Sequence, residues 1–295
     1  MYYRRKIILS LLEVFGNSLS KLEIQKYLFL LSRTQKKPVY DFLPYKYGCY
    51  SFSLKSDLDV MQKKGFLNIS EKIIKRVAEE SFLEALEPED LRGIKKLHAE
   101  SAGYRDEEEL IHYVYTLAPF YAINSLVKEK YLDAKELENV EESKPVKREK
   151  ALCTIGYEGI SIEAYINRLI KNDIRCLVDV RKNPHSMKFG FSGKRLQHIC
   201  EEVGIKYISV RELGIDSDKR KKLETQKDYD ELFKVYLKTN LKNTGESQEY
   251  VLELFKKHKR IALTCFEKDI GKCHRKVLAD YLVTHYSPVK KIKHI

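Results

Sequence analysis

Residues 262–281 read Ala-Leu-Thr-Cys-Phe-Glu-Lys-Asp-Ile-Gly-Lys-Cys-His-Arg-Lys-Val-Leu-Ala-Asp-Tyr, and this segment predicts a strand that turns directly into a helix. Its apolar start ends a strand, and Leu278, Tyr281 and Leu282 recur at helical spacing. In parallel α/β sheets, ligands bind where strands end, and the unpaired N–H groups of a helix start favour anions. The turn therefore predicts a functional site, and it contains Cys265, Glu267, Asp269, Cys273, His274 and Arg275.

The C-terminal half around this segment alternates strand and helix patterns. Strand patterns occupy residues 152–156, 174–180, 206–210 and 260–265, and helix patterns occupy residues near 162–169, 196–203, 229–241 and 249–258. Such alternation predicts a mostly parallel sheet with right-handed crossovers and helices on both faces. We therefore expect a protein of the α/β class in which residues 151–295 form a Rossmann-like domain.

The N-terminal half is predicted to be mainly helical. Apolar stripes in residues 7–15, 22–31 and 54–61 indicate three helices, and residues 66–69 indicate a short strand after them. This order resembles a winged-helix layout, and residues 47–51 (Tyr-Gly-Cys-Tyr-Ser) resemble the SocA-like Panacea antitoxin-type domains. We expect residues 1–132 to bind nucleic acid or a partner, and residues 133–150 to form a charged linker.

Composition and charge indicate a soluble protein with a polyanionic partner. The 295 residues, 43% of them hydrophobic, suffice for two domains. Apolar runs are shorter than the ~20 residues that span a bilayer. The six cysteines lack paired spacing, so we expect a cytoplasmic protein without a membrane partner. Residues 1–150 carry 26 Lys+Arg against 24 Asp+Glu, whereas residues 151–295 carry 29 against 19, which favours nucleic acid, DNA in particular, over a merely solvated lysine-rich surface.

Several short blocks of the C-terminal half occur together and in order. They are Thr154–Gly159 (Thr-Ile-Gly-Tyr-Glu-Gly), residues 177–184 with Ser186, Phe191-Ser192, residues 204–207, Leu213-Gly214, residues 265–269 and residues 273–275. Together they resemble the family catalogued as domain of unknown function 488 over most of residues 150–285. The resemblance implies a Rossmann-like fold and no particular reaction. It also implies an arginine after Ser186, where this chain has Met187, so one anion contact is expected to be missing or supplied by Lys188.

Three predicted strand ends bring polar side chains to one edge of the sheet. The carboxylates there are Glu158, Asp179 and Glu267. Asp179 lies beside Arg181, and either acts as a catalytic carboxylate or fixes the Arg181 loop through a structural ion pair. Glu158 or Glu267 is its candidate partner in acid–base chemistry. The predicted contacts to phosphate or base are Tyr157, Arg181, Lys182, His185, Ser186, Lys188, Lys194, His274 and Arg275.

Cofactors and metals find little support in the sequence. The chain has no Gly-x-Gly-x-x-Gly and no P-loop, so no nucleotide cofactor is predicted. Cys265, Cys273 and His274 are candidate metal ligands, but they lack a Cys-x-x-Cys pair, so we predict no metal. Neighbouring helical residues point about 100° apart, so Cys273 and His274 do not predict a nucleophile–base pair, and Cys273 is assigned to packing.

A basic rim with carboxylates predicts an enzyme that acts on nucleic acid. Hydrolysis of an N-glycosidic bond needs a carboxylate that stabilises the oxocarbenium ion or activates water. We therefore expect a metal-independent, glycosylase-like enzyme that extrudes a damaged or modified base, in DNA repair or phage defence. A metal-dependent nuclease that uses the three carboxylates as ligands, and a non-enzymatic regulator of toxin–antitoxin type, are the alternatives.

Overall fold

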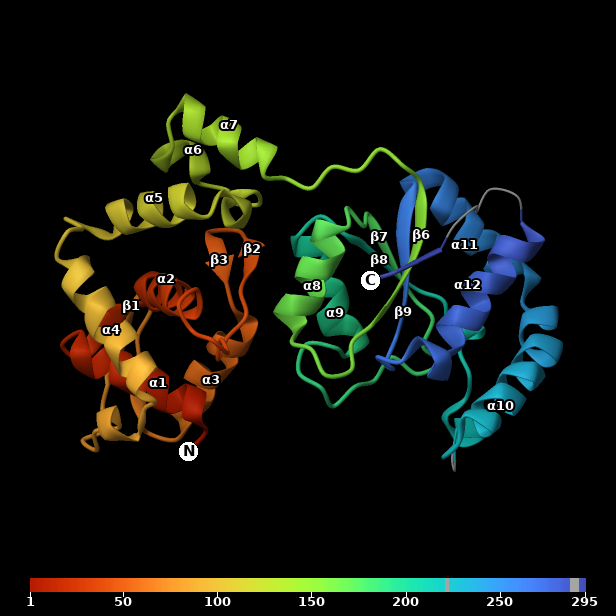
Figure 1. Ribbon diagram of the computed structural model, residues 1–295, viewed down its shortest axis with the longest axis horizontal. Helices are drawn as coiled ribbons and strands as arrows, with labels where there is room; N and C mark the ends of the chain where they lie inside the picture. The colour runs from red at the N-terminus through yellow and green to blue at the C-terminus, as the bar shows by residue number, and fades with distance from the viewer. Residues whose placement is uncertain (221–222, 287–291) are drawn as a thin grey trace. The chain divides into compact units, whose positions relative to one another are not determined.

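The structure is a computed structural model that describes residues 1–220, 223–286 and 292–295 (Figure 1). The chain forms two compact units, Met1–Lys144 and Pro145–Ile295. Among the described residues, no helix is both long and apolar enough to cross a membrane.

The N-terminal unit is mainly helical, as the apolar stripes predicted. Its helices are α1 (Tyr3–Val14), α2 (Lys21–Ser32), α3 (Phe52–Lys63), α4 (Pro88–Ser101), α5 (Glu107–Leu117), α6 (Lys128–Tyr131) and α7 (Ala134–Glu142), with 3-10 turns η1 (Leu83–Ala85) and η2 (Pro119–Ala122). Helix α2 begins at a capping box, in which the Ser20 hydroxyl accepts from the Glu23 N–H and the Glu23 carboxylate accepts from the Ser20 N–H. Local side-chain chemistry therefore fixes where this helix starts.

Short strands accompany these helices. Strands β1 (Ser18–Ser20), β5 (Ile73–Arg76) and β4 (Leu67–Ile69) form an antiparallel sheet in that order, and β2 (Leu43–Tyr45) pairs with β3 (Gly48–Tyr50). Along the chain these elements follow the order α1, β1, α2, α3, β4, β5. The β2–β3 hairpin between α2 and α3 is an addition that the sequence did not indicate.

The charged segment between the units is shorter than the predicted linker. Residues 134–142 form α7, because Asp133 and Glu136 make a capping box at its start and Val140 is buried. The boundary between the units lies at Lys144 and Pro145, inside the predicted range 133–150. The first half of that range is thus a helix of the N-terminal unit.

The C-terminal unit contains a five-stranded, wholly parallel sheet. Its strands are β6 (Ala151–Gly156), β7 (Cys176–Asp179), β8 (Lys206–Ser209), β9 (Arg260–Cys265) and β10 (Ile292–His294), in the order β10-β6-β9-β7-β8. Strand β9 is buried along its whole length between β6 and β7. The predicted α/β sheet is confirmed, and β10 is a fifth strand that the sequence did not reveal.

Helices cover both faces of this sheet. They are α8 (Ile162–Lys171), α9 (Gly193–Glu202), α10 (Gln226–Thr239), α11 (Gly245–His258) and α12 (His274–His285), with 3-10 turns η3 (Arg211–Leu213), η4 (Ser217–Arg220), η5 (Leu241–Asn243) and η6 (Ile270–Lys272). In Figure 1, α8 and α9 lie on one side of the strands and α11 and α12 on the other. Val178 and Leu263 pack with Phe255 of α11 and Leu278 of α12 in one apolar cluster. Every residue of β7 and β9 is buried, so both faces of the sheet are covered at its centre.

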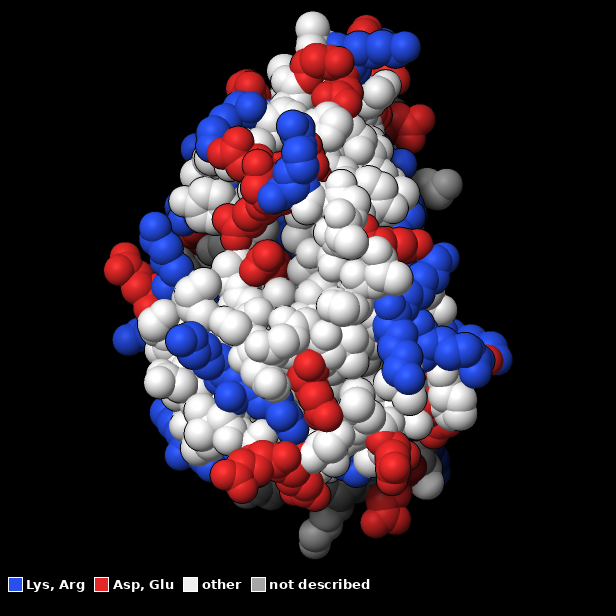
Figure 2. Space-filling model, turned by 90° about the vertical axis from the view of Figure 1, so that its left-hand side faces the viewer, with Lys and Arg blue, Asp and Glu red and all other residues white. Residues whose placement is uncertain are grey.

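The surface of the N-terminal unit carries mixed charge. Figure 2 faces the side on which α1–α4 lie in Figure 1, and Lys and Arg side chains are interspersed there with Asp and Glu. This agrees with the nearly equal numbers of acidic and basic residues in residues 1–150. The electrostatic argument for a polyanionic partner therefore rests on the C-terminal half.

Candidate functional site at the carboxyl edge of the sheet

A pocket of about 220 Å³ opens among the loops that follow β6, β7 and β9. Because these three strands are parallel neighbours, their carboxyl ends meet at the edge where α/β proteins bind ligands. The residues that line the pocket are Tyr157, Arg181, Lys182, Asn183, His185, Ser186, Ile215, Cys265, Phe266 and His274.

The segments after β6 and β9 remain joined beyond the sheet. The Phe266 carbonyl accepts from the N–H groups of Tyr157 (3.1 Å) and Glu158 (2.9 Å). A Cβ atom on Gly156 would lie 2.0 Å from the Glu267 carbonyl oxygen. Only glycine permits this approach at the end of β6, and the approach sets one wall of the pocket.

Asp179 is completely buried and its oxygens are fully engaged. Oδ1 accepts from the Arg181 backbone N–H (3.1 Å) and Nε (2.8 Å), and Oδ2 accepts from Arg181 Nη2 (2.5 Å) and the Tyr207 hydroxyl (2.6 Å). Asp179 is not among the residues that line the pocket. This geometry favours the structural alternative for Asp179, a carboxylate that holds Arg181 in place.

Arg181, which Asp179 holds in place, in turn contacts Tyr157 in the pocket wall. Its Nη1 donates to the Tyr157 hydroxyl (2.7 Å) and to the Phe191 carbonyl (2.9 Å), and the Tyr157 ring stacks on the Phe191 ring at 4.3 Å. Burial lowers the pKa of the Arg181 guanidinium, but the hydrogen bonds and charge of Asp179 outweigh burial and raise that pKa above its usual value. Arg181 is therefore a permanent cation whose donors are largely taken up by the protein.

The two remaining carboxylates lie outside the lining. Glu158 is exposed, and its Oε2 accepts from the Lys268 N–H at 2.9 Å. Glu267 is half-buried, and its Oε2 lies 3.2 Å from Cys265 Sγ and 2.9 Å from Cys273 Sγ. None of the three predicted carboxylates thus lines the pocket, whereas its lining includes the Cys265 thiol, two imidazoles, and the cations Arg181 and Lys182.

Lys182, His185 and Ser186 line the pocket as the sequence expected, and both Lys182 and His185 are exposed. Two other predicted basic residues do not line it. Lys188 donates from Nζ to the Tyr157 carbonyl (2.5 Å), and burial lowers the pKa of its ammonium. Lys194 is exposed on α9.

The two basic residues at the start of α12 are buried. His274 Nε2 lies 2.9 Å from the Val180 carbonyl, and Arg275 Nη1 donates to the Glu267 carbonyl at 2.6 Å. His274 still reaches the pocket, whereas Arg275 braces the turn after β9. Of the predicted anion-binding pair, only His274 faces the site.

Three lining residues were not among the residues of the predicted site, namely Asn183, Ile215 and Phe266, whereas Cys265 belongs to the predicted turn. Phe266 is 42% exposed and its ring packs edge-on against Tyr157 at 5.3 Å. Ile215 follows Gly214, where a Cβ would lie 2.1 Å from the Lys182 backbone nitrogen. The Leu213-Gly214 block was the signal for this contact, since a glycine there lets two loops touch.

The family comparison agrees with this division of the chain. Residues 161–282 match the family model described as Domain of unknown function DUF488. This match covers most of the C-terminal unit, Pro145–Ile295. No curated protein matches the chain. The match begins after β6, so the Thr154–Gly159 block lies outside it, and the description of the family names no reaction.

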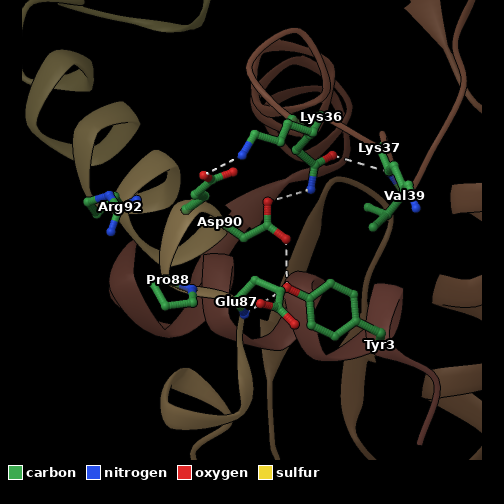
Figure 3. Close-up of a pocket in the computed structure, with 10 residues that line it drawn as sticks. Tyr3, Lys36, Lys37, Val39, Glu87, Pro88, Asp90 and Arg92 are labelled. Atoms are coloured by element: carbon green, nitrogen blue, oxygen red, sulfur yellow. Dashed lines mark hydrogen bonds and ion pairs between the residues drawn. The ribbon is translucent and has the colours of Figure 1, made fainter.

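The N-terminal unit has hollows of its own. The largest of those described, about 600 Å³, lies between the start of α1, the residues after α2 and the start of α4 (Figure 3). Its polar groups pair with one another, since the Tyr3 hydroxyl donates to Asp90 Oδ2 (2.6 Å) and Gln35 Nε2 donates to Asp90 Oδ1 (2.9 Å). These hydrogen bonds connect α1 and the residues after α2 to α4, so the Asp90 carboxylate has a structural role here.

A second hollow, of about 300 Å³, has a buried lysine in its lining. Lys26 is 1% exposed, and its Nζ donates to the Tyr47 carbonyl at 2.7 Å and lies 5.2 Å from the centre of the Tyr115 ring. A Cβ on Gly48 would lie 2.4 Å from Tyr115 Cε1 and 2.7 Å from this Nζ, so glycine lets both side chains pack here. The Tyr-Gly-Cys-Tyr-Ser segment therefore encloses a cation.

Proposed function

We propose that the DUF488 domain acts on nucleic acid and hydrolyses the N-glycosidic bond of one base held in the pocket at the carboxyl edge. The observation that carries this proposal is the pocket itself. Its 220 Å³ is smaller than the roughly 300–1,000 Å³ of sites for drug-sized ligands. That size suits a single extruded base better than a dinucleotide cofactor.

The chemistry of the lining supports a nucleotide as ligand. Lys182 and His185 are exposed on the loop after β7, where they suit contacts to a phosphate backbone. Phe266 offers an exposed ring on which a base stacks, a contact worth roughly 1–3 kcal/mol per base. The excess of basic residues in residues 151–295 supports the same partner.

The roles of the carboxylates follow from their contacts. Asp179 is assigned to holding Arg181, because its oxygens already accept five hydrogen bonds and it lies outside the lining. Glu158 and Glu267 remain as candidates to activate water or stabilise the oxocarbenium ion. Glu158 follows Tyr157 of the lining, and Glu267 touches Cys265 of the lining. We assign the N-terminal unit to DNA contact or partner recognition.

The experiment is incubation of the full chain with plain and base-modified DNA, with and without chelator, followed by alkali to reveal abasic sites. Alkali-dependent breaks that persist in chelator and disappear in Glu158→Gln or Glu267→Gln are the expected result. Breaks that need metal and no alkali would instead identify the nuclease.

Binding without a product would favour the regulator. In that experiment, Lys182→Ala is expected to weaken binding and to lower the salt-dependence slope by about 1. Lys194→Ala, an exposed lysine outside the lining, is the matched control. Equal losses in the two variants would refute a DNA path through the pocket.

A further inference from the structure

A cluster of thiols, imidazole and carboxylate lies in the turn between β9 and α12. The ligand atoms of Cys265, Cys273 and His274 all lie within 4.8 Å of one another, and all three residues are buried. Glu267 Oε2 lies 3.2 Å from Cys265 Sγ and 2.9 Å from Cys273 Sγ. Two sulfurs, a ring nitrogen and a carboxylate oxygen therefore converge within one turn.

The contacts of His274 fix which nitrogen faces the cluster. Nε2 lies 2.9 Å from the Val180 carbonyl oxygen, and because a carbonyl only accepts, Nε2 carries the hydrogen. In a neutral imidazole, Nδ1 then presents its lone pair, and Nδ1 lies 3.7 Å from Cys265 Sγ. Histidines that bind metals donate their other N–H to a backbone carbonyl or carboxylate in this way.

The separations fit a tetrahedral ion. Zinc–sulfur bonds of about 2.3 Å and zinc–nitrogen bonds of about 2.0–2.1 Å place ligand atoms roughly 3.5–3.8 Å apart. The distance from Cys265 Sγ to His274 Nδ1, 3.7 Å, already has this value. The Glu267 oxygen is closer to the sulfurs and would move back by roughly half an ångström around such an ion.

Without a metal, the cluster consists of thiols hydrogen-bonded to a carboxylate. A thiol is a weak donor, so each S–H group contributes little to holding the Glu267 carboxylate. A cation at the centre would bind both sulfurs and the carboxylate directly. The site lacks a Cys-x-x-Cys pair because its candidate ligands come from a strand end and from the helix start after it.

We propose that Cys265, Cys273, His274 and Glu267 bind one divalent transition-metal ion of the zinc class. On binding, each thiol loses a proton to solvent and binds as thiolate, while His274 binds through neutral Nδ1. Because the protein supplies all four ligands, the site is of the closed, structural kind. It would fix Cys265 and His274 in the pocket wall. Because Glu267 would then be a ligand, Glu158 would be left as the candidate catalytic carboxylate; the metal site itself holds whether or not the domain is a glycosylase.

The test is cobalt binding to the reduced full chain in chelator-free buffer. Co²⁺ bound by thiolates gives a sulfur-to-metal charge-transfer band, and a tetrahedral site gives strong visible absorption. We expect one Co²⁺ per chain, displaced by Zn²⁺, in the wild type and in Cys200→Ala, which removes a buried cysteine on α9 outside the cluster. In Cys273→Ala the charge-transfer band should be lost or greatly weakened.

A folded Cys273→Ala that keeps the full band would overturn the site, as would a reduced wild type that binds no Co²⁺. Far-UV circular dichroism establishes whether each variant folds. If Cys273→Ala does not fold, Cys265→Ser and the stoichiometry of the wild type carry the test. A second readout is the thermal unfolding of the wild type, whose midpoint should rise as Zn²⁺ is added.

Discussion

The ion pair between Asp179 and Arg181 decides whether Asp179 is an anchor or a catalyst. Asp179→Asn keeps the size of the side chain but removes its charge, so the guanidinium, 5% exposed, stays buried without its counter-charge. Breaking a buried pair in this way costs about 3–5 kcal/mol. We therefore expect this loss in the free energy of unfolding of the C-terminal unit.

Hydrogen exchange followed by mass spectrometry reports on that unit separately from the other. Peptides that cover β7 should exchange roughly two to four orders of magnitude faster in Asp179→Asn, if global opening governs their exchange. Since the chain has no tryptophan, urea unfolding followed by far-UV circular dichroism is the companion measurement.

Two further variants separate the contributions of the hydrogen bond and of the buried charge to this loss of stability. Tyr207→Phe removes one hydrogen bond to the Asp179 carboxylate and should cost about 1.5–3 kcal/mol. The double variant Asp179→Asn with Arg181→Met removes the stranded charge, so it should cost less than the two single changes together. A loss below about 1 kcal/mol in Asp179→Asn would refute the anchor, and loss of activity at unchanged stability would make Asp179 catalytic.

Three other predictions follow from single residues. Gly156→Ala should destabilise the C-terminal unit by at least about 1–3 kcal/mol, since its Cβ would meet the Glu267 carbonyl at 2.0 Å. The control Gly245→Ala, whose Cβ would have no atom within 4 Å, should be near neutral. Equal unfolding midpoints for the two variants would contradict the close approach at Gly156. Lys26→Met should stabilise the N-terminal unit by about 1 kcal/mol or more, because it removes a buried ammonium whose described partners include no carboxylate. A lower unfolding midpoint in this variant would show instead that the ammonium supports the fold. Burial, and then the charges of Lys257 and Lys206, lower the pKa of the His258 imidazole below its ordinary 6.5. The contribution of His258 to the free energy of unfolding is therefore present above pH 6.5 and is lost as the pH falls through the lowered pKa. In His258→Gln this part of the pH dependence should vanish from unfolding curves.

The sequence predicted the sheet because its strands are buried on both faces. Strands β6, β7 and β9 are nearly continuous apolar runs between helical stripes, and such runs signal a parallel sheet. Strand β10 has only Ile292, Lys293 and His294, and none of the three is buried, so its pattern carried no signal. The α7 helix was hidden for the opposite reason, because its charged composition resembles that of a linker.

The sequence indicated the edge of the sheet at which the pocket opens and some of the side chains that line it, but not all of them. The parallel-sheet rule places Tyr157, Arg181 and Cys265 together, since each follows or ends a neighbouring strand. Which groups face the pocket depends on contacts between distant segments. The Tyr207 hydroxyl on β8 donates to the Asp179 carboxylate on β7, and no local sequence pattern predicts this contact.

The position of β9 also governs the order in which the C-terminal unit assembles. Without β9, the sheet would fall into two pieces, β10–β6 and β7–β8, because β9 alone joins β6 to β7. During synthesis, β6 and β7 leave the ribosome roughly 80–110 residues before their central partner, and such non-local pairings form slowly. Their apolar faces remain open meanwhile, so chains that stop before Arg260 should aggregate, and no fragment short of β9 should carry the pocket.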